Sequence, residues 1–232
     1  MLRTNCRAQF TADDFQFIIH TLSKAPSQAV ALTDLLTDDE MRDSVIDDDL
    51  IYQTLIDSER WLAVSPHFYF YILVRRVLLW AGLDDRSVAD YLASVLVEYG
   101  RRSAAGDPST GSNLFTQFYL SDLMVMLKDA NPWQRLEIRS HIGDTAIFIS
   151  GIFIDRVNAI RDRRGGPSIR FYDQMGQSSY FEASCDRLIH ETDQGPVFDV
   201  LGREYIKVRK ALNHLSDSVL HLSQDRFPLL PS

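Results

Sequence analysis

The sequence predicts an all-α fold, a bundle of about eight to ten helices around one central apolar helix from Ser65 to Gly82. Helix caps and helix stops recur along nearly the whole chain, and apolar residues between them mostly repeat every three or four positions. Hydrophobic residues make up 45% of the 232 positions, which is enough for a continuous core. We therefore expect a single helical domain over residues 1–232, with short acidic helices in residues 1–64 packed on a main bundle of residues 65–232.

The first helix is expected from about Thr11 to Lys24, because Thr11 is suited to cap it and Pro26 stands beyond its end. Three or four short helices should follow between residues 27 and 65, since aspartates stand where each apolar group restarts.

An acidic segment from Asp34 to Glu59 holds ten carboxylates against one arginine, Arg42. Helix caps and first-turn charges explain most of these acids. Calcium is the alternative at Asp47 to Asp49, but an EF-hand loop needs a glycine at its sixth position and a glutamate at its twelfth. The sequence has neither, so no metal site is predicted there.

The central helix is predicted to begin at Ser65 and Pro66 and to stop at Gly82, and it is nearly apolar all round. A second helix is expected from about Asp85 to Arg102.

An antiparallel hairpin of these two helices would place Arg76 level with Asp90. Arg76 has apolar helical neighbours, and a guanidinium on apolar surface needs a partner or water. We therefore expect a structural ion pair between Arg76 and Asp90.

Four further helices are expected in the C-terminal half, at about Asn113 to Asp129, Asn131 to Arg163, Ser168 to His190 and Val197 to Leu222. The β-rich run from Ala146 to Ile154 leaves a hairpin as a minority alternative. The last helix carries an apolar seam with alternating spacings of four and three, which is typical of packing between helices. Bundle packing inside the chain is the first interpretation of this seam, and a homodimer through the last helix is the alternative.

A cluster of arginines surrounds the glycine turn that follows the predicted helix end near residue 163. Its members are Arg161, Arg163, Arg164 and Arg170, and Ser168 is placed to cap the next helix. Arginine charge, a helix dipole and free backbone N–H groups together favour an anion. The sequence therefore predicts an anion-binding site, while basic residues at an ordinary helix end are the alternative.

One helical face in the same region carries Glu137, His141 and Asp144, whose spacing brings both carboxylates near the imidazole. Helix bundles bind iron, manganese or zinc with such groups, but they usually carry a Glu-x-x-His motif on each of two helices. That pair of motifs is missing, so we predict a polar face at the surface and no metal site.

Composition limits the classes of partner. A net charge of −8 argues against nucleic acid, because phosphate binding depends on basic side chains. The amino terminus lacks the apolar run of a signal peptide, and no apolar run has the length of a membrane span. We expect reduced thiols at Cys6 and Cys185, which form neither a disulfide framework nor a ligand cluster, and this favours the cytoplasm.

The sequence identifies no cofactor and no catalytic residue, and it does not decide whether the chain is an enzyme. We expect a helical binding or interaction module that takes a small anionic ligand or a protein partner. The alternative is a helix-bundle enzyme with a metal or organic cofactor in an internal pocket.

Overall fold

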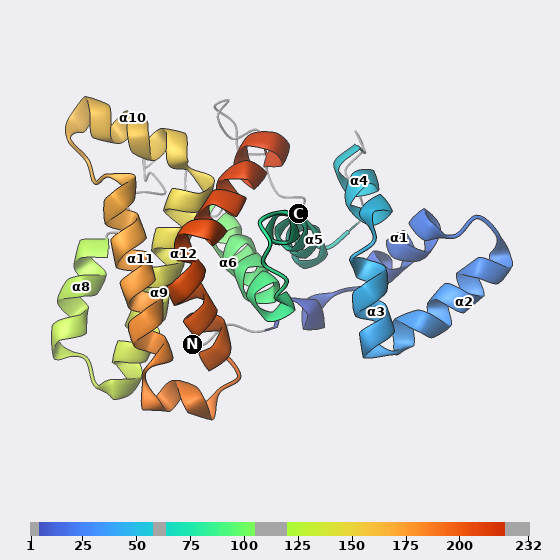
Figure 1. The fold of residues 1–232 in the computed structure, drawn as a ribbon, viewed down its shortest axis with the longest axis horizontal. Helices are drawn as coiled ribbons and strands as arrows, with labels where there is room; N and C mark the ends of the chain where they lie inside the picture. Colours follow the sequence, from blue (N-terminus) through green and yellow to red (C-terminus); the bar gives the residue numbers. More distant parts are fainter. Residues whose placement is uncertain (1–4, 58–63, 105–119, 221–232) are drawn as a thin grey trace. The chain divides into compact units, whose positions relative to one another are not determined.

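The computed structural model describes residues 5–57, 64–104 and 120–220. These ranges contain eleven α-helices and no strand, which confirms the all-α class (Figure 1). None of the helices described combines the length and the apolar character that a membrane span requires.

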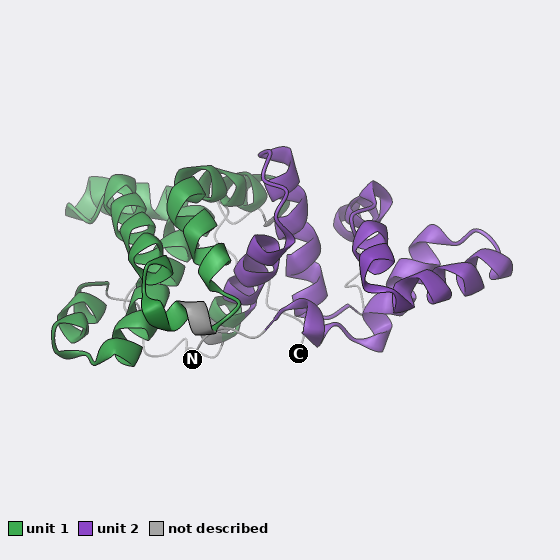
Figure 2. Cartoon of the chain, turned by 60° about the horizontal axis from the view of Figure 1, so that its bottom comes forward, with its two compact units in different colours: residues 1–3, 98–230 green, residues 4–97, 231–232 purple. Residues whose placement is uncertain are grey.

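The chain divides into two compact units, and the division falls within one helix, between Val97 and Glu98 (Figure 2). The described parts of unit 2 are residues 5–57 and 64–97, and those of unit 1 are residues 98–104 and 120–220. The predicted division after residue 64 does not coincide with this boundary. The single domain over the whole chain stays a prediction.

Unit 2 contains the N-terminal helices, which are α1 (Ala12–Leu22), α2 (Pro26–Thr37), α3 (Asp39–Ile46), α4 (Asp49–Asp57), α5 (Pro66–Trp80) and the first part of α6 (Arg86–Ala104). Thr11 caps α1 as predicted, in a reciprocal capping box with Asp14. The Asp14 carboxylate also accepts hydrogen bonds from the backbone N–H (2.6 Å) and the hydroxyl (2.7 Å) of Ser65. These hydrogen bonds connect the start of α5 to the start of α1.

The predicted apolar helix is present as α5. The Ser65 hydroxyl accepts the N–H of Phe68 (3.1 Å), and the chain leaves the helix through Gly82, whose φ of 72° favours glycine. Every position from Tyr71 to Arg75 is buried, so this segment is covered on all sides. The central place of α5 in the whole bundle stays a prediction.

Unit 1 contains the C-terminal helices, which are the end of α6, α8 (Leu120–Asp129), α9 (Pro132–Ile152), α10 (Ile154–Arg164), α11 (Ile169–Ser184) and α12 (Gly195–Leu215). Helices α9, α11 and α12 pack side by side (Figure 1). The predicted seam of α12 is buried inside this unit through Leu201, Tyr205, Val208, Leu212 and Leu215. The predicted start of the helix before α9, residues 113–119, lies outside the described residues.

The predicted helix from Asn131 to Arg163 is wrong in one respect, because it breaks at Phe153 into α9 and α10. Side chains of α12 and the turn after it accommodate the break. The Asn213 amide donates to the carbonyls of Ser150 (2.8 Å) and Gly151 (2.7 Å), and the Ser216 hydroxyl donates to that of Ile152 (2.7 Å). A helix end leaves its last carbonyls without internal partners, and these donors satisfy them.

Two glycines allow the three long helices of unit 1 to approach closely. A Cβ at Gly143 of α9 would lie 2.7 Å from the Tyr180 ring of α11, and a Cβ at Gly176 of α11 would overlap the Tyr205 ring of α12. Both tyrosines are fully buried, so neither ring is free to move aside. These contacts fix how the helices pack.

Gly176→Ala is expected to destabilise the protein by about 1–3 kcal/mol, the usual cost of forcing extra volume into a packed core. Gly195→Ala is the control, since a Cβ there would meet Ile189 at an ordinary 3.6 Å. Urea unfolding of both variants measures the difference. Equal stability of Gly176→Ala and the unchanged protein would contradict this account of the packing.

Candidate functional site

The antiparallel packing of α11 and α12 sets the geometry of the candidate site. At one contact, a Cβ at Gly202 would lie 3.0 Å from the Phe181 backbone. Nearer the start of α11, Arg209 forms an ion pair with Asp173 (2.7 Å). Residues later in α12 therefore lie level with residues earlier in α11.

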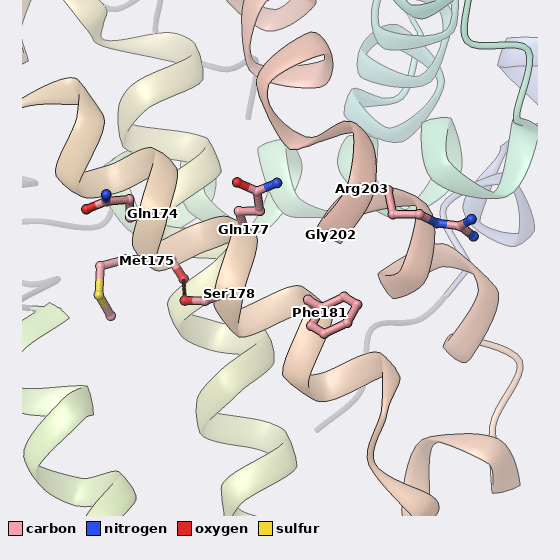
Figure 3. Close-up of a pocket in the computed structure, with 7 residues that line it drawn as sticks. All are labelled: Gln174, Met175, Gln177, Ser178, Phe181, Gly202 and Arg203. Atoms are coloured by element: carbon pink, nitrogen blue, oxygen red, sulfur yellow. Dashed lines mark hydrogen bonds between the residues drawn. The ribbon is translucent and has the colours of Figure 1, made fainter.

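An open groove of about 700 Å³ runs along this helix pair (Figure 3). Its lining comes from five residues of α11 and two of α12, namely Gln174, Met175, Gln177, Ser178, Phe181, Gly202 and Arg203. The α11 residues recur with helical spacing, so they form one face of that helix. The absence of a side chain at Gly202 lets the two backbones approach at the Phe181 end of the groove.

Large apolar side chains are exposed in the lining of the groove and one helical turn beyond it on α12. The ring of Phe181 is 51% exposed, and Ile206, one turn beyond Gly202 on α12, is 46% exposed. Neither residue belongs to the buried side of its helix. Clustered exposed apolar residues with polar neighbours are typical of an interaction surface.

The other end of this helix pair is basic. Arg170 stands one turn before Gln174 on α11, and Lys210 stands one turn after Ile206 on α12. Both are exposed, and neither forms an ion pair with a described residue, although Lys210 is near enough to Asp173 to act on that carboxylate electrostatically. Because the helices are antiparallel, these two cations belong to the same end of the groove.

The other cations on the outer side of α12 are already paired within the helix. Arg203 forms an ion pair with Asp199, and Lys207 lies 2.7 Å from Glu204. Arg170 and Lys210 therefore differ from these cations, because neither forms an ion pair with a described residue.

The predicted anion-binding residues lie at the junction of α10 and α11. Helix α10 ends at Arg164, and Gly165 follows with a φ of 66°. Arg161 forms an ion pair with its neighbour Asp162 (2.9 Å), and the Ser168 hydroxyl accepts the N–H of Phe171 (3.3 Å) as the predicted cap.

The remaining arginines of this cluster are open to solvent. Arg163, Arg164 and Arg170 are exposed, and no described carboxylate forms an ion pair with any of them. Anion binding here stays a prediction. Phe181 and Lys210, at opposite ends of the groove, were not predicted from the sequence, although both fall outside the buried stripes of their helices.

The structure does not bring Arg76 and Asp90 together, which corrects the predicted ion pair. Arg76 binds the carboxylate of Asp49 and the backbone carbonyl of Asp47 (2.9 Å). The Asp90 carboxylate accepts the backbone N–H groups of Cys6 (2.9 Å) and Arg7 (2.8 Å). Partners distant in sequence replaced the one that the hairpin register suggested.

Asp47 lies at the centre of an Asp–Arg network in unit 2. Its carboxylate forms two hydrogen bonds with Arg75 (2.9 and 2.8 Å) and one with Arg86 (2.7 Å). Arg75 also binds Asp84 (2.6 Å), and only 4% of its side chain is exposed. Several acids that we assigned to helix capping therefore neutralise arginines instead.

Hydrogen bonds to tyrosines engage two members of the predicted polar face on α9. Tyr180 donates to Asp144 (2.8 Å), while the Tyr99 hydroxyl lies 3.1 Å from His141 Nδ1 and 2.8 Å from the Thr145 hydroxyl. Across the described residues, no three His, Cys, Asp or Glu side chains are placed to hold a metal ion. Asp144 is buried, so the predicted surface position is wrong for that residue, and these contacts give Asp144 and His141 a structural role.

Comparison with family models, curated proteins and solved structures finds no match to this chain. Its own geometry is the basis for the function proposed below.

Asp47→Asn is expected to lower the free energy of unfolding at neutral pH by about 3 kcal/mol, because it leaves the buried Arg75 charge with Asp84 alone. Burial raises the pKa of Asp47, but the hydrogen bonds and charges of Arg75 and Arg86 outweigh it and hold the pKa below its usual value. The contribution of the Asp47 carboxylate to the free energy of unfolding is then complete above its unfolded-state pKa of about 3.9. It is lost as pH falls through the lower folded-state pKa.

Urea unfolding at several pH values checks this, with the exposed Asp34→Asn as the control. A difference between the unchanged protein and Asp47→Asn that widens on acidification would contradict the assignment.

Proposed function

We propose that the chain is a helical interaction module whose α11–α12 groove binds an acidic amphipathic segment of a protein partner. One observation carries the proposal: a groove with exposed apolar side chains ends beside exposed cations that form no ion pair with a described carboxylate.

The apolar part of the groove suits partner side chains. Its volume of about 700 Å³ lies within the roughly 300–1,000 Å³ of ordinary binding clefts. Phe181 and Ile206 offer apolar area at its edge, and an amphipathic helix laid along such a groove inserts residues spaced by three or four positions.

The basic end selects the charge of the partner. Arg170 and Lys210 stand at that end, and Arg163 and Arg164 lie in the last turn of α10, just before α11 in the sequence. In a chain with a net charge of −8, a cluster of unpaired cations attracts carboxylates and gives an interaction that weakens with salt. In this proposal, Arg163, Arg164 and Arg170 of the predicted anion site bind the acidic residues of the partner.

The test is fluorescence anisotropy with a labelled amphipathic peptide of leucine and glutamate, together with its lysine counterpart. The full-length protein is expected to bind the acidic peptide and not the basic one. Phe181→Ser combined with Arg170→Ala should weaken binding by at least about tenfold. Val125→Ser with Lys128→Ala, two exposed positions of α8, is the matched control and should bind like the unchanged protein.

Equal affinities of the two double variants would refute the assignment of the groove, as would equal binding of both peptides. If inorganic phosphate binds in an Arg170-dependent manner while the acidic peptide does not bind, the site is restricted to small anions and the proposed protein partner is wrong.

A further inference from the structure

Helices α2 and α3 form a second exposed surface that their own unit does not cover. Leu36 is the only residue of α2 that is fully buried. Apolar side chains point to solvent instead, with Val30 65%, Leu35 40% and Met41 50% exposed. Leaving such groups in water costs free energy, and clustered exposure of this kind is typical of a binding surface.

The same surface is acidic. Asp34, Asp39 and Glu40 are exposed around these apolar residues. The only cation of α2 and α3 is Arg42, which lies 2.6 Å from Asp39. Asp34 and Glu40 form no ion pair with any described residue, so the surface presents unneutralised carboxylates.

We propose that the occupant of the α11–α12 groove is the α2–α3 surface of a second copy of this chain. The inference rests on the proposed function of the groove and names its partner. The two surfaces match in both respects that decide docking, since each exposes apolar side chains and their unpaired charges are opposite: Asp34 and Glu40 on one, Arg170 and Lys210 on the other.

A second copy fits the observations because every chain carries one α11–α12 groove and one α2–α3 surface. Each groove can therefore bind the α2–α3 surface of another chain. Ile206 and Lys210 lie on the exposed face of α12, since the apolar seam of this helix is buried inside unit 1. The charges on both surfaces are exposed to solvent, where salt screens them and ion pairs contribute little. We therefore expect a reversible self-association that depends on protein concentration and on salt.

Sedimentation velocity on full-length chains tests this with two charge-reversed variants. The first carries Arg170→Glu and Lys210→Glu in the groove, and the second carries Asp34→Lys and Glu40→Lys on α2 and α3. In each variant alone, the groove and the α2–α3 surface carry charges of the same sign and repel each other. Each variant should therefore associate at least about tenfold more weakly than the unchanged protein. An equimolar mixture of the two should associate again, because every contact then joins opposite charges. Lys128→Glu is the control and should leave association unchanged.

Raising the ionic strength from about 0.1 M to about 1 M shortens the screening length from about 10 Å to about 3 Å and should dissociate the unchanged protein. Circular dichroism confirms that each variant is folded. A monomer at all concentrations, in a protein that still binds the acidic peptide through the groove, would overturn the second copy as occupant and leave the proposed function standing. Association that survives both charge reversals, or a mixture that does not recover it, would also overturn the inference.

Discussion

The close antiparallel approach of α11 and α12 determines where every residue of the groove lies. Gly176 accepts the buried Tyr205 ring, and Gly202 lies directly against the Phe181 backbone. Together these contacts allow a single register, which faces the apolar seam of α12 inward and leaves Ile206 outside. The same register brings Arg170 and Lys210 to one end. The groove is thus a consequence of core packing.

Only some carboxylates of unit 2 are available at its surface, because hydrogen bonds and ion pairs inside the unit bind the others. Within unit 2, the Asp47 carboxylate accepts hydrogen bonds from Arg75 and Arg86, and the Asp90 carboxylate accepts them from backbone N–H groups. Buried charges need such partners, so these acids contribute to folding and are unavailable for binding. Asp43 of α3 also pairs with Arg7, at 2.8 Å. Asp34 and Glu40 lie outside this network and keep their charge toward solvent. In unit 1 a local group of exposed arginines lies at the end of α10 and the start of α11.

Local signals in the sequence predicted the helices well, because a cap or a stop acts within one turn. Thr11 and Ser65 cap their helices as predicted. Features that depend on distant residues were not predictable. The break at Phe153 is accommodated by Asn213, about sixty positions later, and Arg76 found Asp49 in a different helix. Likewise Arg170 was identified from the arginine cluster, but the groove beside it appears only once the helix register is known.

Site-specific photo-crosslinking tests the central claim most directly, that the α11–α12 groove holds the α2–α3 surface of another copy. The photoreactive residue benzoylphenylalanine would replace Gln177, which lines the groove, in unlabelled chains mixed with ¹⁵N-labelled chains. Mass spectrometry should find the light Gln177 peptide joined to heavy peptides from residues 26–46, with less product at high salt. Crosslinks confined to light chains, or directed to other helices of the heavy chain, would contradict the claim.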